Sequence, residues 1–298
     1  MARKIEIPCF FSHFQKEQSF AIDIDEQEDI SFRTLDNLGY NDELDKEFEE
    51  LNPLSGPFLL KNAIRGDLIE ITIKNIHITR DIGLSSCGIL PKYLKKNNAL
   101  PILGEEVVFW KVEDKVCTPF ICEKITNQSI KLTPSIGCIR CSGDENDKII
   151  SSLECDEYGG NLDFIKLNEN AKIYLPVLTN NAWFYIGDVH AAQSEAEIGG
   201  SGIEVSAEVT LSVSVVKNGL SKKMHLLENN NIHFFGFGNN LSHSLKSAFD
   251  EALSCLRKKN GNDALSRLLI SQSAKINVIK LESPVIVSIS LEQSLYFK

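Results

Sequence analysis

Alternating apolar and polar residues dominate the first 235 positions of this chain and predict β-strands. The clearest run, residues 67–79, reads Asp-Leu-Ile-Glu-Ile-Thr-Ile-Lys-Asn-Ile-His-Ile-Thr, and residues 204–216 alternate in the same way. Shorter runs of the same kind lie at 19–24, 30–35, 171–177, 182–186 and 284–291. The chain is therefore expected to be rich in β-structure.

Helical periodicity appears only near the end of the chain. In residues 242–259 apolar positions recur at helical spacing, with Ser242 as the expected N-cap and Asn260-Gly261 as the stop. A second helix is expected from Asn262 or Asp263 to Ile270. The pattern predicts a β-rich α+β fold, with strand-dominated, sandwich- or barrel-like sheets and a C-terminal helical pair.

Length and charge narrow the choice of function. The 298 residues suffice for one large domain or two, and we expect a β-rich region over 1–135 and an α+β region with the main site motifs over 136–298. The net charge of −10 is carried by the window 23–50, which holds twelve acids and two bases. An acidic chain without a basic stripe makes nucleic acid or an anionic membrane an unexpected partner. The acidic run 42–50 is expected to form a short solvated helix or a surface excursion.

The compartment is predicted from what the chain lacks. The first residues contain no apolar segment typical of a signal peptide, and no run approaches the ~18 apolar residues of a membrane span. We therefore expect a cytoplasmic protein with reduced thiols. Cys117, Cys122, Cys138 and Cys141 allow a four-cysteine zinc site, but the first pair is too widely spaced for a usual zinc knuckle. Buried small hydrophobes are the simpler interpretation.

The densest group of reactive side chains lies in residues 187–204, which contain four carboxylates, one histidine and four glycines. If Asp188 and His190 continue the preceding strand, both side chains lie on one face. Such a pair suits a divalent metal, or a base with its orienting partner. A polar loop between strands is the alternative. A second cluster, Gly-Gly-Asn-Leu-Asp at 159–163, suits a tight loop presenting an amide and a carboxylate, or an ordinary turn.

Three segments taken together carry a further signal. They are Gly-Gly-Asn-Leu-Asp at 159–163, Tyr-Leu-Pro-Val at 174–177 and Gly-Asp-Val-His-Ala-Ala-Gln at 187–193. In order and spacing they resemble the acetamidase/formamidase family of amidohydrolases. Asn-Pro-Leu-Ser-Gly-Pro-Phe at 52–58 and Phe-Arg-Thr-Leu-Asp at 32–36 are similar to further motifs of that family, so the resemblance covers nearly the whole chain.

The resemblance implies hydrolysis of a small amide, of the formamide or acetamide class, to a carboxylate and ammonia by a homo-oligomer such as a dimer. It also implies a divalent metal, zinc or calcium, held by Asp188 and His190 with Asp36 as a further carboxylate ligand. Glu197 would take a proton from water and pass it to the leaving nitrogen. Asn161 would donate to the developing oxyanion, and with Asp163 it would line or brace the pocket.

One departure from the family pattern bears on activity. Where the family has Gly-Asp-Gly-Glu, this chain has Ser194, Glu195, Ala196 and Glu197. If either glycine requires a positive φ, the loop must rearrange. Two other functions therefore stay open: a catalytically degraded member that binds a small ligand or metal, and a hydrolase of another C–N bond, as in lactams or ureido compounds.

Overall fold

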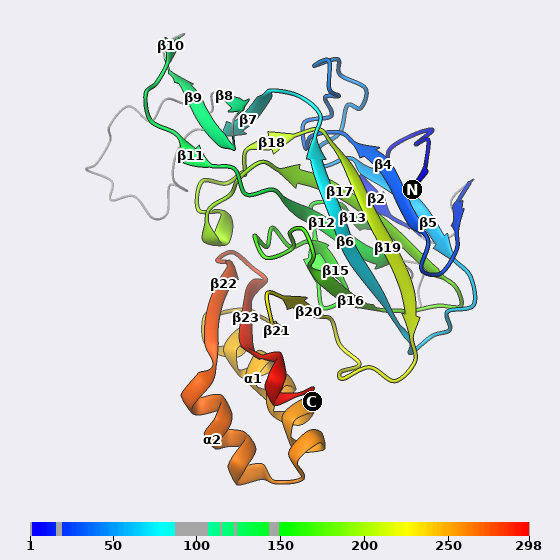
Figure 1. The fold of residues 1–298 in the computed structure, drawn as a ribbon, viewed down its shortest axis with the longest axis vertical. Helices are drawn as coiled ribbons and strands as arrows, with labels where there is room; N and C mark the ends of the chain where they lie inside the picture. Colours follow the sequence, from blue (N-terminus) through cyan, green and yellow to red (C-terminus); the bar gives the residue numbers. More distant parts are fainter. Residues whose placement is uncertain are drawn as a thin grey trace.

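A computed structural model describes residues 2–15, 20–86, 107–113, 115–121, 124–142 and 149–297. Nearly half of the described residues lie in strands, almost all of them in two large sheets, and the helical pair lies at the C-terminal end (Figure 1). The predicted β-rich α+β class is therefore confirmed. Within the described residues each sheet has open edges, so the architecture is a sandwich and no closed barrel forms. No helix among these residues is long and apolar enough to cross a membrane.

The first sheet has nine described strands that come from the whole length of the chain. In spatial order they are β1 (Arg3–Lys4), β4 (Asp29–Thr34), β19 (Ala207–Val216), β6 (Leu68–Ile78), β16 (Lys172–Pro176), β20 (His225–Glu228), β21 (Asn231–Gly238), β23 (Val285–Glu292) and β22 (Lys275–Lys280). The two longest alternating runs of the sequence form β6 and β19, which pair antiparallel at its centre.

The second sheet carries the loops that matter for chemistry. Its main path is β10 (Lys124–Ile125), β9 (Val116–Ile121), β8 (Val107–Glu113), β7 (Ile82–Ser86), β18 (Glu204–Val205), β17 (Ala182–His190), β12 (Ser135–Ser142), β15 (Gly159–Asn161) and β14 (Cys155–Asp156). β11 (Ile130–Lys131) pairs with β9, while β5 (Leu54–Leu60) joins β17 to β3 (Ile22–Ile24). A small separate sheet pairs β2 (His13–Phe14) with β13 (Ile150–Ser151).

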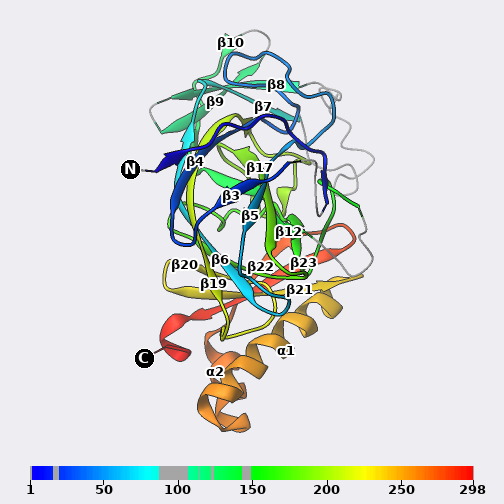
Figure 2. The ribbon, with the colours of Figure 1, turned by 90° about the vertical axis from the view of Figure 1, so that its right-hand side faces the viewer.

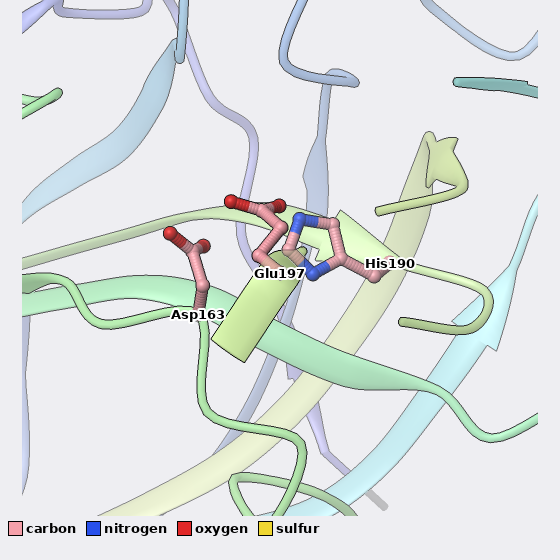
Figure 3. Close-up of side chains that lie close together, drawn as sticks. All are labelled: Asp163, His190 and Glu197. Carbon is pink, nitrogen blue, oxygen red and sulfur yellow. The ribbon is translucent and has the colours of Figure 1, made fainter. Parts of the chain in front are cut away.

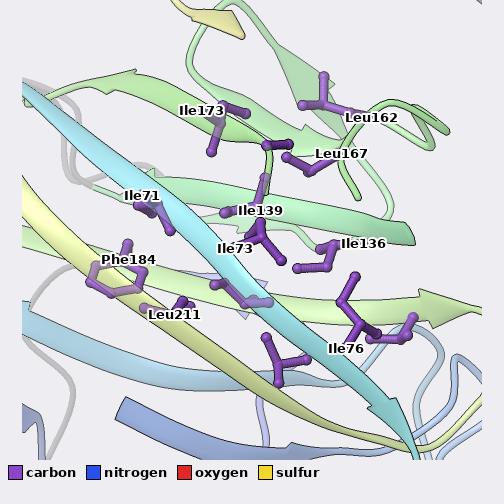
Figure 4. Close-up of a cluster of buried hydrophobic side chains, with 14 of the residues drawn as sticks. Ile71, Ile73, Ile76, Ile136, Ile139, Leu162, Leu167, Ile173, Phe184 and Leu211 are labelled. Carbon is purple, nitrogen blue, oxygen red and sulfur yellow. The ribbon is translucent and has the colours of Figure 1, made fainter. Parts of the chain in front are cut away.

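The main hydrophobic core lies between the two sheets (Figure 4). Ile71 and Ile73 of β6 and Leu211 of β19 face Ile139 of β12 and Phe184 of β17, and all five are fully buried. Burying each such side chain contributes about 1.5–3 kcal/mol. This packing makes the central strands of the second sheet a rigid base for the residues at their ends.

The helices are α1 (Leu241–Asn260) and α2 (Asp263–Ser273), which pack on β21 and β23 as a C-terminal layer (Figures 1 and 2). The predicted stop is confirmed, because Gly261 adopts the left-handed conformation. The predicted N-cap was wrong: the side chain of Asn240, and not that of Ser242, accepts the amide of His243. Asn262 caps α2 as expected.

Residues 42–50 form turns and bends rather than a helix, so the expected short helix is wrong and the segment is an excursion of the chain. Arg33 of β4 donates both guanidinium nitrogens to the carboxylate of Glu47 and ties the excursion to the first sheet. Strands from both sides of residue 135 share each large sheet. The division into two regions stays a prediction.

Candidate active site

The candidate site lies where three strands of the second sheet end. Asp188 and His190 lie at the end of β17, which continues four residues beyond the strand predicted over 182–186, and Glu204 begins β18 directly opposite His190. Asp163 follows β15, and Glu197 lies on a short 3-10 helix, η2 (Glu195–Glu197). Residues that are distant in sequence therefore meet through strand pairing.

A first group of donor atoms surrounds the imidazole of His190. Its Nε2 lies 3.3 Å from Oδ1 of Asp188 and 3.4 Å from Oε2 of Glu204, and all three side chains are buried. None of these three atoms has a hydrogen-bond partner within the described part of the chain. Zinc bonds of 2.0–2.2 Å in tetrahedral geometry place ligand atoms about 3.3–3.6 Å apart. The donor set therefore fits a divalent cation.

A second group shares the same histidine (Figure 3). Asp163, His190 and Glu197 each offer one ligand atom, and these atoms lie within 4.8 Å of one another. Oδ1 of Asp163 is a further buried atom that no described residue satisfies. Glu197 is only partly buried, so the second group forms the more accessible side of the site.

The orientation of His190 is set by Gln193. Nε2 of Gln193 donates to the backbone oxygen of Asp163 at 2.9 Å, which leaves its Oε1 facing Nδ1 of His190 at 2.8 Å. Because an amide oxygen only accepts, Nδ1 carries a proton, which leaves Nε2 as the nitrogen that faces the carboxylates of Asp188 and Glu204. A hydrogen bond of this kind is the usual way in which a metal-binding histidine is held.

Two glycines provide the space that the site needs. A Cβ added to Gly137 of β12 would lie 2.4 Å from Oδ2 of Asp188 and 2.7 Å from Oδ1 of Asp163. A Cβ on Gly202 would lie 2.6 Å from Cγ of His190. The two carboxylates thus pack directly against the backbone of Gly137, and the imidazole packs against that of Gly202.

Four residues of the site adopt left-handed backbone conformations, although none is glycine. The φ angles are 49° for Asp163, 61° for Asp188, 58° for Ala196 and 45° for Glu197. Such conformations cost on the order of 1 kcal/mol or more each and cluster at functional sites. Ala196 stands where the family pattern has its second glycine, and its positive φ is a conformation that glycine adopts without strain and alanine does not.

Burial and neighbouring charges shift the pKa values of the clustered side chains. Burial, followed by the charge of Asp188, raises the pKa of Asp163 to about 8. Burial, followed by Asp163, raises the pKa of Glu197 to about 8. Burial would lower the pKa of His190, but Glu204 and Asp188 raise it well above its usual range. Negative charge is therefore in excess, which a cation would relieve.

The predicted pocket residue Asn161 is held in a chain of amides. Its Nδ2 donates to Oδ2 of Asp163 at 2.9 Å, and its Oδ1 accepts from Nδ2 of Asn52 at 2.6 Å. Asn52 is fixed in turn by the backbone oxygen of Ser152. These contacts fit the bracing role that the sequence suggested for Asn161.

The structure does not bring Asp36 into either group of donor atoms. Its buried carboxylate accepts from Nη2 of Arg80 at 2.5 Å and from the amides of Leu38 and Tyr40. The same Arg80 nitrogen also donates to the backbone oxygen of Glu204 at 3.1 Å. Asp36 thus contacts the site only indirectly, through Arg80. The third donor beside Asp188 and His190 is Glu204, to which the sequence analysis assigned no role. The signal for it was its place at the start of the long alternating run.

The four-cysteine hypothesis has no support in the described residues. Cys122 lies outside them, and neither group of donor atoms includes a cysteine. Cys138 and Cys141 are buried in two different hydrophobic clusters. Burial raises the pKa of Cys141 to about 12, as expected for an inert thiol.

Comparisons with known proteins point to one family. The model of the Acetamidase/Formamidase family matches residues 147–242, which include Asp163, Asp188, His190 and Glu197. A putative formamidase of Schizosaccharomyces pombe is 24% identical over 273 residues, 72% of this chain and 66% of that protein. A formamidase of Methylophilus methylotrophus is 22% identical over 236 residues, 62% of this chain and 57% of that protein. The matches thus span less than two thirds of these relatives.

The fold is shared with a solved structure. An acetamidase of Bacillus halodurans superposes with a TM-score of 0.83 at 21% identity, over 98% of this chain and 97% of that one. The family match, the two relatives and the shared fold agree with the motifs of the sequence, so the resemblance is confirmed.

Proposed function

We propose that this chain, whose resemblance to the acetamidase/formamidase family is confirmed, is a metal-assisted amidohydrolase acting on a small aliphatic amide of the formamide or acetamide class. The observation that carries the proposal is the set of buried donor atoms on Asp188, His190 and Glu204 that lack hydrogen-bond partners in the described chain, beside two carboxyls whose pKa is near 8. The cytoplasmic location and the homodimer predicted from the sequence belong to the same proposal.

Asp188, His190 and Glu204 would hold the cation, with Asp163 and Glu197 on its accessible side. Calcium takes oxygen ligands, whereas imidazole nitrogen suits zinc, so His190 favours zinc. When bound, such a cation polarises a carbonyl group and lowers the pKa of water.

Glu197 is the proton carrier in this proposal. Hydrolysis of an amide by water must remove a proton from the attacking water and deliver one to the departing nitrogen. Glu197 is the partly accessible carboxyl of the cluster and lies beside Asp163 and His190, so it is placed to exchange protons with a water molecule at the site. Its Oε atoms accept the water proton and then return it to the amine.

Asp163 orients the substrate. The carboxylate of Asp163 lies beside that of Glu197 (Figure 3), and its Oδ1 has no hydrogen-bond partner among the described residues, so it would accept an N–H of the substrate amide. Asn161 holds the other oxygen of Asp163, which fixes the direction of that hydrogen bond. A fixed orientation of the scissile amide lowers the entropic barrier to reaction.

Ammonia release from a panel of short amides, with and without a chelator, tests the proposal. We expect turnover of formamide or acetamide that chelation abolishes and zinc restores. Glu197→Gln should lower kcat by about 10²-fold or more, as expected for loss of a general base. The matched control is Glu195→Gln, an exposed residue on the same short helix, which should keep wild-type activity.

The other outcomes identify the two alternatives. Zinc binding without ammonia release from any amide would indicate a binding protein with degraded catalysis. Turnover of lactams or ureido compounds alone would indicate a hydrolase of another C–N bond. Near-normal kcat in Glu197→Gln would overturn the role of that residue.

A further inference from the structure

The C-terminal hairpin brings a lysine to the candidate site. β22 pairs with β23, and the register shifts between Val278 and Lys280, where one extra residue is inserted. Such bulges redirect side chains and are frequent beside active sites. The same strand packs against η2, which carries Glu197, and in Figure 1 the turn of the β22–β23 hairpin points toward that short helix.

Lys280 is close to the cluster but is not paired with it. Its Nζ donates to Sγ of Cys155 at 4.0 Å, and its charge acts to lower the pKa of both Asp163 and Glu197. No carboxylate oxygen of the described residues lies within 4.0 Å of this ammonium group, the limit for an ion pair. The ammonium group therefore acts on the two carboxyls through its charge alone, and it keeps N–H donors that no oxygen of the described residues accepts.

The reaction requires a hydrogen-bond donor beside the carbonyl oxygen of the substrate. As water attacks, the carbonyl π electrons move onto oxygen, and a hydrogen bond to that oxygen stabilises the transition state. Asn161 was the donor expected from the sequence, but its amide is held between Asn52 and Asp163. Arg140 is held elsewhere, because its Nη1 donates to Asp156 and to the backbone oxygen of Gly159 while its guanidinium lies over the rings of Phe14 and Tyr158.

We propose that the ammonium of Lys280 donates a hydrogen bond to the carbonyl oxygen of the substrate amide and stabilises the negative charge that develops there. Lys280 keeps its proton throughout, while the C–N bond breaks and the amine leaves with the proton from Glu197. The same contact then holds one oxygen of the carboxylate product. This role rests on the proposed amide hydrolysis, but the binding of a carboxylate can be measured without turnover.

Replacement of Lys280 by methionine keeps the length of the side chain and removes the charge. We expect Lys280→Met to lower kcat and kcat/KM together by about 10²-fold with little change in KM, the effect of losing one oxyanion donor. Lys280→Arg should recover part of the activity. Lys275→Met is the matched control, because Lys275 is exposed at the other end of β22.

Titration calorimetry with acetate supplies the second measurement. Wild type and Lys275→Met should bind acetate at least tenfold more tightly than Lys280→Met. If wild type releases no ammonia from any amide but shows this difference, the proposed function fails while the anion-binding role of Lys280 stands. Equal acetate binding by wild type and Lys280→Met, or a kcat within threefold of wild type, would overturn the proposal. A rise in KM at constant kcat would also overturn it, because that pattern shows ground-state binding alone.

Discussion

Gly137→Ala is the sharpest test of the site geometry. The new methyl group would lie 2.4 Å from Oδ2 of Asp188, whereas ordinary van der Waals contacts begin at 3.4 Å. The carboxylate must therefore move by about 1 Å, and Oδ1 of Asp163, at 2.7 Å, must move as well. The backbone of Gly137 does not have a positive φ, so alanine itself is tolerated there.

The expected magnitude follows from that displacement. A misplacement of about 1 Å at reacting groups costs about 10²-fold in rate, and disturbed ligands lose about 10–100-fold in metal affinity. Overpacking of this kind lowers the free energy of unfolding by about 1–3 kcal/mol, which leaves a protein of this size folded. Activity and zinc binding should thus fall much further than stability.

The assays are kcat/KM for the best amide, zinc affinity by competition with a chromophoric chelator, and urea unfolding. Gly261→Ala controls for lost stability, because its methyl group meets nothing within 4 Å while its φ of 64° strains alanine. It should lower stability by about 1 kcal/mol and leave zinc binding unchanged. If Gly137→Ala keeps kcat/KM within threefold and has the same zinc affinity, then the close approach of Gly137 to the carboxylates does not matter for activity and the argument is refuted.

Three further predictions concern stability. Arg80→Met should lower the free energy of unfolding in urea by about 3–5 kcal/mol, because it leaves the buried carboxylate of Asp36 unpaired, and adding Asp36→Asn should recover part of the loss. In metal-free, chelated protein the melting temperature should fall as the pH rises from 5 to 8, and zinc should restore it. The pKa of Asp163 is raised from 3.8 to about 8 in the folded protein, and that of Glu197 from 4.5 to about 8. The unfolded chain therefore releases these protons at lower pH than the folded one, and stability declines as pH rises. A melting temperature that is flat or rises over this range would contradict the charge argument. Ala196→Gly should raise stability by about 0.5–1 kcal/mol by relieving the positive φ, and an unchanged or lower melting temperature would show that the loop is not strained.

Local patterns predicted much of this fold. Alternation over 67–79 and 204–216 specified β6 and β19, because a sheet with one buried face requires a period of two. Apolar spacing and the Asn-Gly pair at 260–261 specified α1 and its end. The N-cap was misplaced by two residues because Asn240 and Ser242 are both good caps, and only the approach of the chain to the helix selects between them.

The site was predictable only in part. Asp188 and His190 were candidates through their spacing on a strand, with a polar loop as the alternative, and the family resemblance gave them a role. The same resemblance added Asp163, Asn161 and Glu197. The sequence offered Asp36 as a third ligand, but the tertiary structure gives Asp36 to Arg80 and places Glu204 beside His190.

By itself the sequence determined the strand-rich class, the terminal helices and the chemistry available between residues 159 and 204. Only the tertiary structure decided which carboxylates meet around His190, that Gly137 and Gly202 make room for them, and that a bulge brings Lys280 to the same place. The reason is physical: periodicity is a property of neighbouring residues, whereas a site forms from strand pairing and register between segments far apart in the chain.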